Sequence, residues 1–321
     1  MSTKTAEFVS PKHPDKICDF IADSILDAYL AGDKESRVAI EVMGGHKLIT
    51  INGEVTSHAK PDIEKLVQNI VGNDYKIISN IVAQSPEIAH GVDTGGAGDQ
   101  GIMKGYATSE TPEFLPLEYV LARDLCKKIY AVYPFDGKTQ VTIDGERILT
   151  VVASFQNTKN DELLKLVKGI IKADEYLINP AGEWHLGGFD ADTGLSGRKL
   201  VIDNYGPEIP IGGGSFSGKD YTKVDRSGAY MARRIAVELL EKRNALGRSP
   251  MGEAREVYTK LAYAIGKSEP VMTVAVVDGI EEKITGYDLS PKGIREYLKL
   301  EQVRFAETSS WGHFGRGFEW K

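Results

Sequence analysis

The clearest candidate for chemistry is a glycine-rich stretch at residues 212–227, in which three cations and a carboxylate follow a run of glycines. Consecutive glycines let a backbone approach a ligand closely and adopt positive φ angles. Lys219, Lys223 and Arg226 follow, and Asp225 stands among them. Backbone N–H groups and lysines hold phosphate oxygens, and an aspartate can hold a divalent metal that bridges them. These residue types predict a polyphosphate site.

Two other interpretations of this stretch exist. A flexible surface turn with a solvated run of charges has the same composition. Residues 213–219 also fit G-x-x-x-x-G-K, the phosphate-binding loop of many nucleotide hydrolases. That motif continues with Ser or Thr to ligate magnesium, whereas Asp220 follows here and no clear strand leads into the loop. We therefore reject the hydrolase loop and retain the phosphate site.

Other polar clusters have both a structural and a functional interpretation. His13 and Asp15 flank Pro14 at a predicted helix start, where they either cap the helix or point into an anion site. Arg198 and Lys199 are adjacent at a predicted strand start, as a solvated edge or as two anion ligands. Each signal is weak alone, and their joint occurrence in one chain favours the functional interpretation.

A second glycine-rich segment, residues 96–101, matches G-x-G-x-x-G literally. A dinucleotide-binding interpretation is rejected because no strand runs into the segment and Pro112 follows too soon for the expected long helix. A loop role is the safer interpretation of Asp99. Lys138 follows another loop just before a strand, where a lone lysine is usually solvated.

The elements that must position these residues follow from hydrophobic periodicity. Apolar residues recur at helical spacing over 14–30, with Gly32 as the end signal, and again after Asp225. Two strands and then a helix occur three times: 38–42, 48–51 and 61–71; 140–143, 148–155 and 160–172; 261–265, 271–277 and 291–299. The repeat predicts three similar α+β units, each with one sheet face under its helix and the other free to meet another subunit.

Composition limits the class of protein. The 321 residues are 41% hydrophobic and 26% charged, as in an ordinary globular protein of two or three domains. A net charge of −7 offers no global basic footprint for nucleic acid. Cys18 and Cys126 form neither a disulfide framework nor a zinc motif, which fits a reducing cytoplasm. We expect no signal peptide and no membrane span, because apolar runs such as 271–277 are only strand-sized.

Taken together, the motifs resemble the S-adenosylmethionine synthetase (methionine adenosyltransferase) family of bacterial and eukaryotic type. The matching segments occur in family order over nearly the whole chain: 13–16, 96–101, 194–199, 212–220, 223–227 and 312–316. The resemblance implies an α+β fold of three similar domains with pseudo-threefold symmetry, at 1–90, 97–183 and 184–321. It also implies a cytoplasmic homodimer, possibly a tetramer, with active sites at the interface.

The implied reaction suits the residues found. Methionine sulfur attacks C5′ of ATP and expels triphosphate, which is then cleaved to phosphate and pyrophosphate. A thioether has no proton to lose, so the reaction needs no general base. The leaving group is highly charged, and catalysis should consist of positioning and electrostatic stabilisation by cations. The chain accordingly offers lysines, arginines and aspartates but no Ser-His-Asp or Cys-His set.

The resemblance also assigns roles by position, and we state them as expectations. The catalytic residues are His13, Lys138, Arg198 and Lys219. The ATP contacts are His13, Asp136, Lys138, Glu183, Trp184, Asp192, Arg198, Lys199, Ser215 and Lys219. The methionine contacts are Glu54, Gln84, Asp192 and Lys223. Magnesium is expected at Asp15 and Asp225, and potassium at Glu41. Trp184 stands where the family commonly carries Phe and is expected to stack on adenine.

The chain departs from the family pattern in three places. Residues 10–12 read Ser-Pro-Lys where Ser-Glu-Gly is usual, residues 84–96 are several residues shorter, and the chain stops at Lys321 without the usual C-terminal tail. None of these removes an expected catalytic residue, but they bear on lid behaviour over the site and on the oligomer. Two other functions stay open: a magnesium-dependent phosphohydrolase or kinase, and a non-catalytic nucleotide-binding protein.

Overall fold

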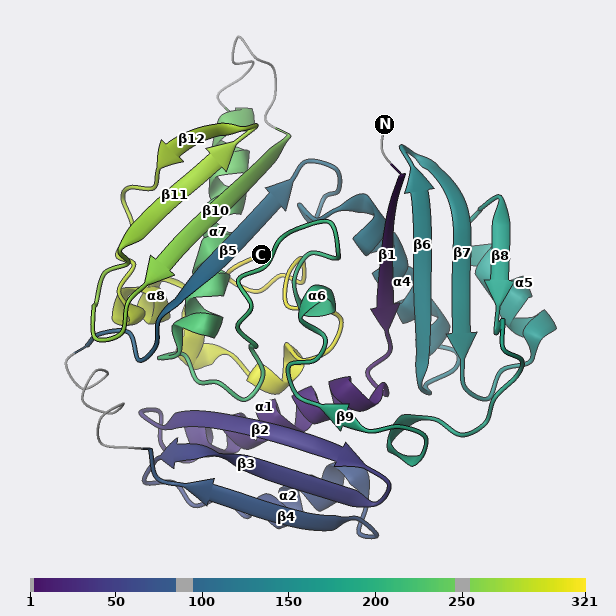
Figure 1. Cartoon of the computed structure of the whole chain (residues 1–321), viewed down its shortest axis with the longest axis horizontal. Helices are drawn as coiled ribbons and strands as arrows, with labels where there is room; N and C mark the ends of the chain where they lie inside the picture. The colour runs from purple at the N-terminus through teal and green to yellow at the C-terminus, as the bar shows by residue number, and fades with distance from the viewer. Residues whose placement is uncertain (1–2, 85–94, 246–254) are drawn as a thin grey trace.

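The computed structural model describes residues 3–84, 95–245 and 255–321, which form three four-stranded sheets with helices against them (Figure 1). The longer helices are α1 (Pro14–Gly32), α2 (Ile63–Val71), α4 (Leu117–Tyr130), α5 (Asn160–Ile170), α7 (Val224–Ala245) and α8 (Pro291–Tyr297), and α6 (Leu200–Asp203) is a single turn. Among the described helices, none has the length and apolar character needed to cross a bilayer.

Each sheet contains one of the expected hairpins. The first has the order β4-β3-β2-β9, the second β1-β6-β7-β8 and the third β12-β11-β10-β5. The strands of the first sheet are β2 (Arg37–Gly45), β3 (Leu48–Thr56), β4 (Lys76–Val82) and β9 (Gly194–Leu195). Those of the second are β1 (Thr3–Val9), β6 (Gly137–Asp144), β7 (Arg147–Phe155) and β8 (Glu175–Ile178). Those of the third are β5 (Gly101–Thr108), β10 (Glu256–Tyr263), β11 (Met272–Val277) and β12 (Ile280–Lys283).

The expected fold class is confirmed, since three α+β units stand around a common centre with their helices behind the sheets in Figure 1. Each sheet also includes a strand from a distant part of the chain. β1 pairs with β6, β9 with β2, and β5 with β10, all antiparallel. Segments 1–90, 97–183 and 184–321 therefore remain a proposed division by sequence, and the sheets cross it.

Helix α1 begins where the sequence predicts and ends at Gly32. His13 is its N-cap, Pro14 opens it, and the N–H of Asp33 closes its last turn on the carbonyl of Tyr29. One face buries apolar residues such as Ile21 and Ile25 completely. The same helix also buries several aspartates, which the structure uses to hold the loops of the site.

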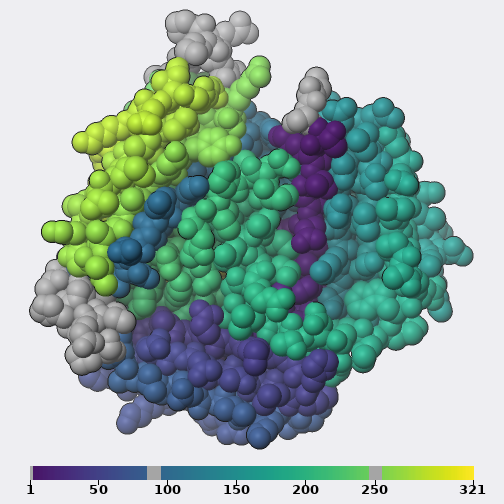
Figure 2. All heavy atoms as spheres, viewed as in Figure 1, coloured from purple at the N-terminus to yellow at the C-terminus, as the bar shows by residue number. Residues whose placement is uncertain are grey.

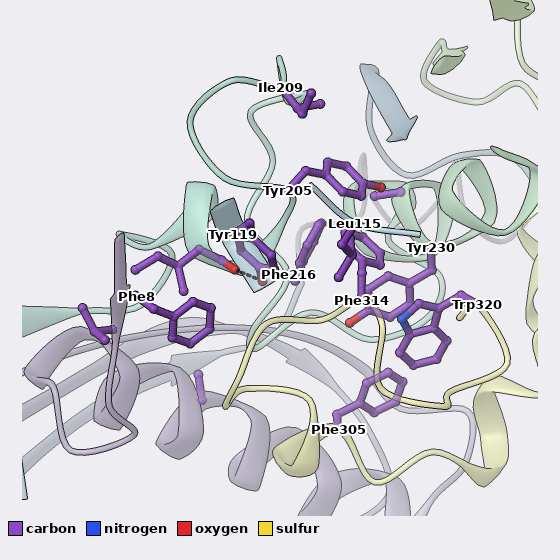
Figure 3. Packing of buried hydrophobic residues seen from close by; sticks show 14 of the residues in the cluster. Phe8, Leu115, Tyr119, Tyr205, Ile209, Phe216, Tyr230, Phe305, Phe314 and Trp320 are labelled. Carbon is purple, nitrogen blue, oxygen red and sulfur yellow. Dashed lines mark hydrogen bonds between the residues drawn. The ribbon is translucent and has the colours of Figure 1, made fainter. Parts of the chain in front are cut away.

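The centre of the molecule is filled mainly by irregular chain, although the short strand β9 within it pairs with β2. In Figure 2 the segment after β8 (green) occupies the space between the three sheets. Beneath it lies an aromatic cluster that joins β1, α4, α7 and the C-terminal segment (Figure 3). The rings of Tyr230 and Trp320 stack with centroids 4.0 Å apart, and the Tyr119 hydroxyl donates to the carbonyl of Ile202 at 2.7 Å. This packing gives the central loops a rigid support.

Candidate active site

The first part of the site is the N-terminus of α1, where Asp15 is almost completely buried. Its Oδ1 accepts the N–H of Leu195 at 2.9 Å, and its Oδ2 accepts a hydrogen bond from Lys199 Nζ. Arg198 Nε lies 3.6 Å from Oδ1. Burial alone would raise the pKa of this carboxyl, but Lys199 and the Leu195 N–H outweigh it and hold the pKa below its ordinary value. Asp15 is therefore a carboxylate surrounded by cations.

His13 precedes this carboxylate and is kept neutral. Its Nδ1 accepts the N–H of Asp15 at 3.2 Å, so the ring proton sits on Nε2. Burial lowers the pKa of His13 to about 3, with help from the charges of Lys199 and Lys138. A neutral imidazole with a free Nε2–H is a hydrogen-bond donor for a phosphate oxygen, not a base.

Lys138 and Asp136 approach this position from β6 and the loop before it. Lys138 is exposed and stands opposite Val9 in the register of β1 and β6, close to His13 along the chain. Asp136 is buried, and its Oδ2 accepts the N–H of Gly188 at 2.9 Å. Burial raises the pKa of Asp136. The lysine is free to meet an anion, while the aspartate holds the loop that carries Asp192.

The second part of the site is the glycine loop and the start of α7. Lys219 Nζ donates to Asp225 Oδ2 at 2.6 Å, and both side chains are partly exposed. Gly214 lies directly over this carboxylate, since a Cβ at that position would stand 2.5 Å from the Asp225 carboxyl carbon. The loop therefore needs glycine there to make its close approach. The expected lysine and aspartate form one pair at a helix start, where an anion or a metal-bridged phosphate is favoured.

Lys223 has a different environment from Lys219. Its Nζ lies 3.0 Å from Oδ2 of the buried Asp220, and the same oxygen accepts the N–H of Val38 at 2.6 Å. Lys223 thus neutralises a carboxylate that ties the loop to β2. Its expected contact with methionine stays a prediction.

The two parts meet across the segment after β9. Ser196 Oγ donates a hydrogen bond to Glu41 on β2, and Ser215 packs against Gly197. The cations of residues 198–199 and the glycine loop are therefore neighbours, and Glu41 lies beside their junction. This arrangement brings the expected potassium ligand next to the phosphate residues.

The remaining expected residues lie in other settings. Glu183 pairs with Lys159 at 2.9 Å and accepts the N–H of Asn160 at 3.0 Å, so it caps α5. Trp184 is half-buried, and its ring lies beside Gly187. Asp192 is exposed, and its carboxylate accepts the N–H of Thr193 at 2.8 Å. Asp192 lies near enough to His13 for its negative charge to oppose the lowering of the His13 pKa, so this carboxylate stands close to the Asp15 cluster.

The expected methionine residues lie on the first sheet. Glu54 is exposed on β3, on the face that no helix covers. Within the part of the chain that the structure describes, the buried Oε1 of Gln84 has no hydrogen-bond partner. Residues 85–94, which hold most of the expected lid, lie outside the described residues.

Sequence reasoning assigned Asp15 but missed that it begins a row of four aspartates on α1. Each accepts a backbone N–H from another segment at 2.8–2.9 Å: Leu195 to Asp15, Gly197 to Asp19, Gly218 to Asp23 and Phe305 to Asp27. Residues four apart lie on one face of a helix. The spacing of four residues was the sequence signal that could have identified them. We call these four residues the aspartate row.

Oxygen ligands suited to hard cations are present, although they do not form a closed cage. Within residues 3–84, 95–245 and 255–321, no three His, Cys, Asp or Glu side chains gather as a metal-binding group. Magnesium is commonly held by one or two carboxylates together with substrate phosphates and water. Asp15 and Asp225, each beside a lysine at a helix start, fit that mode of binding.

Comparison with known proteins agrees with this geometry. The S-adenosylmethionine synthetase family matches in three parts: the N-terminal domain over residues 2–88, the central domain over 94–184 and the C-terminal domain over 186–321. The S-adenosylmethionine synthase of Thermus thermophilus is 39% identical, with 99% of this chain and 95% of that protein aligned. That of Mycoplasmopsis pulmonis is 41% identical over 97% of this chain and 93% of its own.

A solved structure is similar in fold as well as in sequence. It is described as an unusual S-adenosylmethionine synthetase from Campylobacter jejuni, with a TM-score of 0.86, 31% identity, and coverage of 100% of this chain and 96% of that one. The two sequence relatives cover 97% or more of this chain, and the solved structure covers all of it. The chain belongs to the S-adenosylmethionine synthetase family.

Proposed function

We propose that the chain makes S-adenosylmethionine from ATP and L-methionine, the activity for which its family is named. A lone pair of the methionine sulfur forms the S–C5′ bond, the C5′–O bond breaks, and its electron pair leaves with triphosphate. Water then cleaves the triphosphate to phosphate and pyrophosphate. No proton has to be removed from the nucleophile in the first step.

The observation that carries this proposal is the buried Asp15 with Lys199, Arg198 and neutral His13 around it. Such a set offers fixed cations and an N–H donor to an anion. Its one carboxylate, Asp15, already accepts hydrogen bonds from Lys199 and the Leu195 N–H, so it is poorly placed to take a proton from a nucleophile. Fixed donors and charges aimed at a developing negative charge are the main source of catalysis when the leaving group is the difficulty. A triphosphate leaving group has that requirement.

We assign the residues as the family resemblance suggests. His13, Lys138, Arg198 and Lys219 stabilise the leaving group. ATP contacts also include Asp136, Glu183, Trp184, Asp192, Lys199 and Ser215. Methionine contacts are Glu54, Gln84, Asp192 and Lys223. The support for Lys219 is its pairing with Asp225 under the glycine loop.

Two kinds of metal ion complete the proposal. Asp15 and Asp225 would hold Mg²⁺, and Glu41 would hold K⁺. Bound magnesium would supply positive charge that offsets the charge of the phosphate groups. The protein's own part is to keep Asp15 ionised despite its burial, which Lys199 and the Leu195 N–H do.

We propose a homodimer, possibly a tetramer, as the active form, working in the cytoplasm. The support is the uncovered face of the first sheet. Met43, Ile78 and Val82 are each more than 40% exposed there, and the register sets them beside the exposed acids Glu41 and Glu54. A second copy covering this face would bury the apolar side chains and bring its own cations to the acids.

The direct test is incubation of the purified chain with ATP, methionine, magnesium and potassium. S-adenosylmethionine, phosphate and pyrophosphate should appear together and in equal amounts, and omission of methionine should stop the consumption of ATP. Rapid ATP consumption without methionine would instead identify a phosphohydrolase. Binding of ATP without any product would identify a non-catalytic nucleotide-binding protein.

A further inference from the structure

Asp23 and Arg226 form an ion pair with no solvent exposure on either side chain. Their two hydrogen bonds measure 2.6 Å and 3.0 Å. Completely buried side chains of this kind are not placed to touch a substrate. A buried ion pair is also weak evidence for a contribution to stability, because desolvation offsets the attraction. We therefore examine which other groups Asp23 and Arg226 bind.

The pair holds the backbone of the glycine loop on both sides of Lys219. Asp23 Oδ1 accepts the N–H of Gly218 at 2.9 Å, and Arg226 Nη1 donates to the carbonyl of Lys219 at 3.1 Å. Arg226 also follows Asp225 directly in the first turns of α7. The same ion pair therefore determines where both members of the Lys219–Asp225 pair stand.

The guanidinium of Arg226 has little freedom to move. Besides Asp23 and the Lys219 carbonyl, it donates to the Tyr230 hydroxyl at 3.0 Å and to Thr308 Oγ1 at 2.9 Å. These contacts use every N–H group that a guanidinium has. Its central carbon also lies 4.3 Å from the centre of the Phe305 ring. The glycine loop is thus bound to a guanidinium group that is held by hydrogen bonds around its edge and by a phenylalanine ring against its face.

We propose that Asp23 and Arg226 are positioning residues, which set the Lys219–Asp225 pair for the triphosphate without touching it. The proposal rests on the proposed function, since it concerns the same site. Catalytic groups need support that fixes them to about 0.5 Å. A misplacement of about 1 Å from a distant mutation can cost roughly 100-fold in rate.

The test compares Asp23→Asn with Asp27→Asn, a matched change one turn further along the aspartate row. Asp27 accepts the N–H groups of Phe305 and Ala306 and has no contact with the glycine loop among the described hydrogen bonds. Asp23→Asn should lower kcat about 100-fold and weaken the binding of inorganic triphosphate with magnesium, measured by calorimetry, about tenfold. Asp27→Asn should leave both quantities within about twofold of the wild type, a change of less than ~0.5 kcal/mol.

A second variant covers the case in which Asp23→Asn does not fold, because it leaves a buried arginine partly unpaired. Asp23→Leu with Arg226→Met removes both charges and replaces them with apolar groups of similar volume. This double variant should fold and should show the same loss of triphosphate binding, because Gly218 and the Lys219 carbonyl lose their partners.

Each outcome bears on the proposal. Wild-type triphosphate binding in a folded Asp23→Asn or double variant would overturn it, as would an equal loss in Asp27→Asn. Aggregation of both Asp23 variants would mean that the ion pair is needed only for folding, and this result would also overturn the proposal. A wild-type protein that makes no S-adenosylmethionine would refute the proposed function instead, and triphosphate binding would still report on the ion pair.

Discussion

At the scale of single residues, one small region holds two neighbours in different charge states. Asp15 and His13 are both buried, and burial disfavours the charged form of each. Lys199 and a backbone N–H overcome that effect for Asp15, while the same lysine adds to it for His13. A cluster of cations therefore yields a carboxylate and a neutral imidazole side by side. The first suits a metal, and the second suits a phosphate oxygen.

Lys219→Met should remove synthesis without unfolding the protein. The Nζ–Asp225 contact at 2.6 Å is partly exposed, so its loss costs little stability. Loss of a preorganised charge contact of this kind costs on the order of 10²–10³ in rate. The measurement is kcat for S-adenosylmethionine formation together with the thermal midpoint.

Lys292→Met provides a matched control, because that lysine is 83% exposed on α8. The control should keep wild-type turnover and change stability by less than about 0.5 kcal/mol. Near-wild-type turnover of folded Lys219→Met would remove the glycine loop from the mechanism.

At the scale of elements, helix α1 organises the site through Asp15, Asp19 and Asp23 of the aspartate row. Its apolar face packs in the core, and its aspartates reach the segments that carry Lys199 and Lys219 as well as the C-terminal segment. One rigid helix thereby aligns loops that are far apart in sequence. A helix supports such alignment better than a loop does, because its own hydrogen bonds hold its side chains at fixed spacing.

Gly218→Ala should disturb this alignment directly. Gly218 has φ of +82°, and a Cβ there would stand 2.0 Å from the carbonyl oxygen of Ile40. We expect a loss of more than about 1 kcal/mol in the free energy of unfolding and roughly a 100-fold fall in kcat through displacement of Lys219. Urea unfolding and steady-state kinetics measure the two effects.

Gly169→Ala is the opposite case within the same protein. Gly169 lies in α5 with open space around its Cα and no positive φ, so alanine should stabilise the helix by about 0.5–1 kcal/mol. If Gly218→Ala is tolerated as well as Gly169→Ala, the loop is not held tightly against β2.

Asp27 should make stability depend on pH in an unusual direction. Burial raises its pKa from 3.8 to about 6, although two backbone N–H groups oppose the shift. The folded state then binds the proton more tightly than the unfolded state, so Asp27 favours folding below about pH 4 and loses that contribution as pH rises through 6. The difference amounts to at most about 3 kcal/mol.

The measurement is urea unfolding of the wild type and Asp27→Asn from pH 4 to pH 9. The free energy of unfolding of the wild type should fall relative to the variant as pH rises, and both curves should run parallel above pH 7. Parallel curves throughout would mean that Asp27 has an ordinary pKa.

Local patterns predicted the elements of this protein better than their pairing. Apolar spacing predicted α1 to within two residues of its end, and the three hairpins and following helices are present. The same spacing left Asp19 and Asp23 unassigned, because polar positions on an amphipathic helix are usually solvated. The pairing of β1 with β6, β5 with β10 and β9 with β2 was not predicted for another reason. The partners are more than a hundred residues apart, and a local sequence pattern carries no information about such pairing.

At the scale of the whole molecule, the uncovered face of the first sheet predicts an obligate dimer. Met43, Ile78, Val82 and Leu195 are exposed there in the single chain. Sedimentation at assay concentrations should show a dimer, and activity per chain should fall on dilution below its dissociation constant. A fully active monomer would refute this prediction.

A matched pair of variants locates the interface. Ile78→Lys puts a charge on the uncovered face and should dissociate the dimer and remove activity. Val132→Lys changes a residue of similar exposure beyond the end of α4 and should leave both unchanged. Equal effects of the two substitutions would contradict the assignment of this face.

The exchange of strands also affects the order in which the chain can fold while it is being made. β1 leaves the ribosome first, yet its neighbour β6 follows about 130 residues later, a delay of roughly 7 to 26 seconds at ordinary rates of translation. β5 waits even longer for β10. Strands β1 and β2, which lie in the N-terminal third of the chain, each pair with a strand that is synthesised much later. Nascent chains therefore carry unpaired strand edges, which chaperones recognise, until most of the protein has been synthesised.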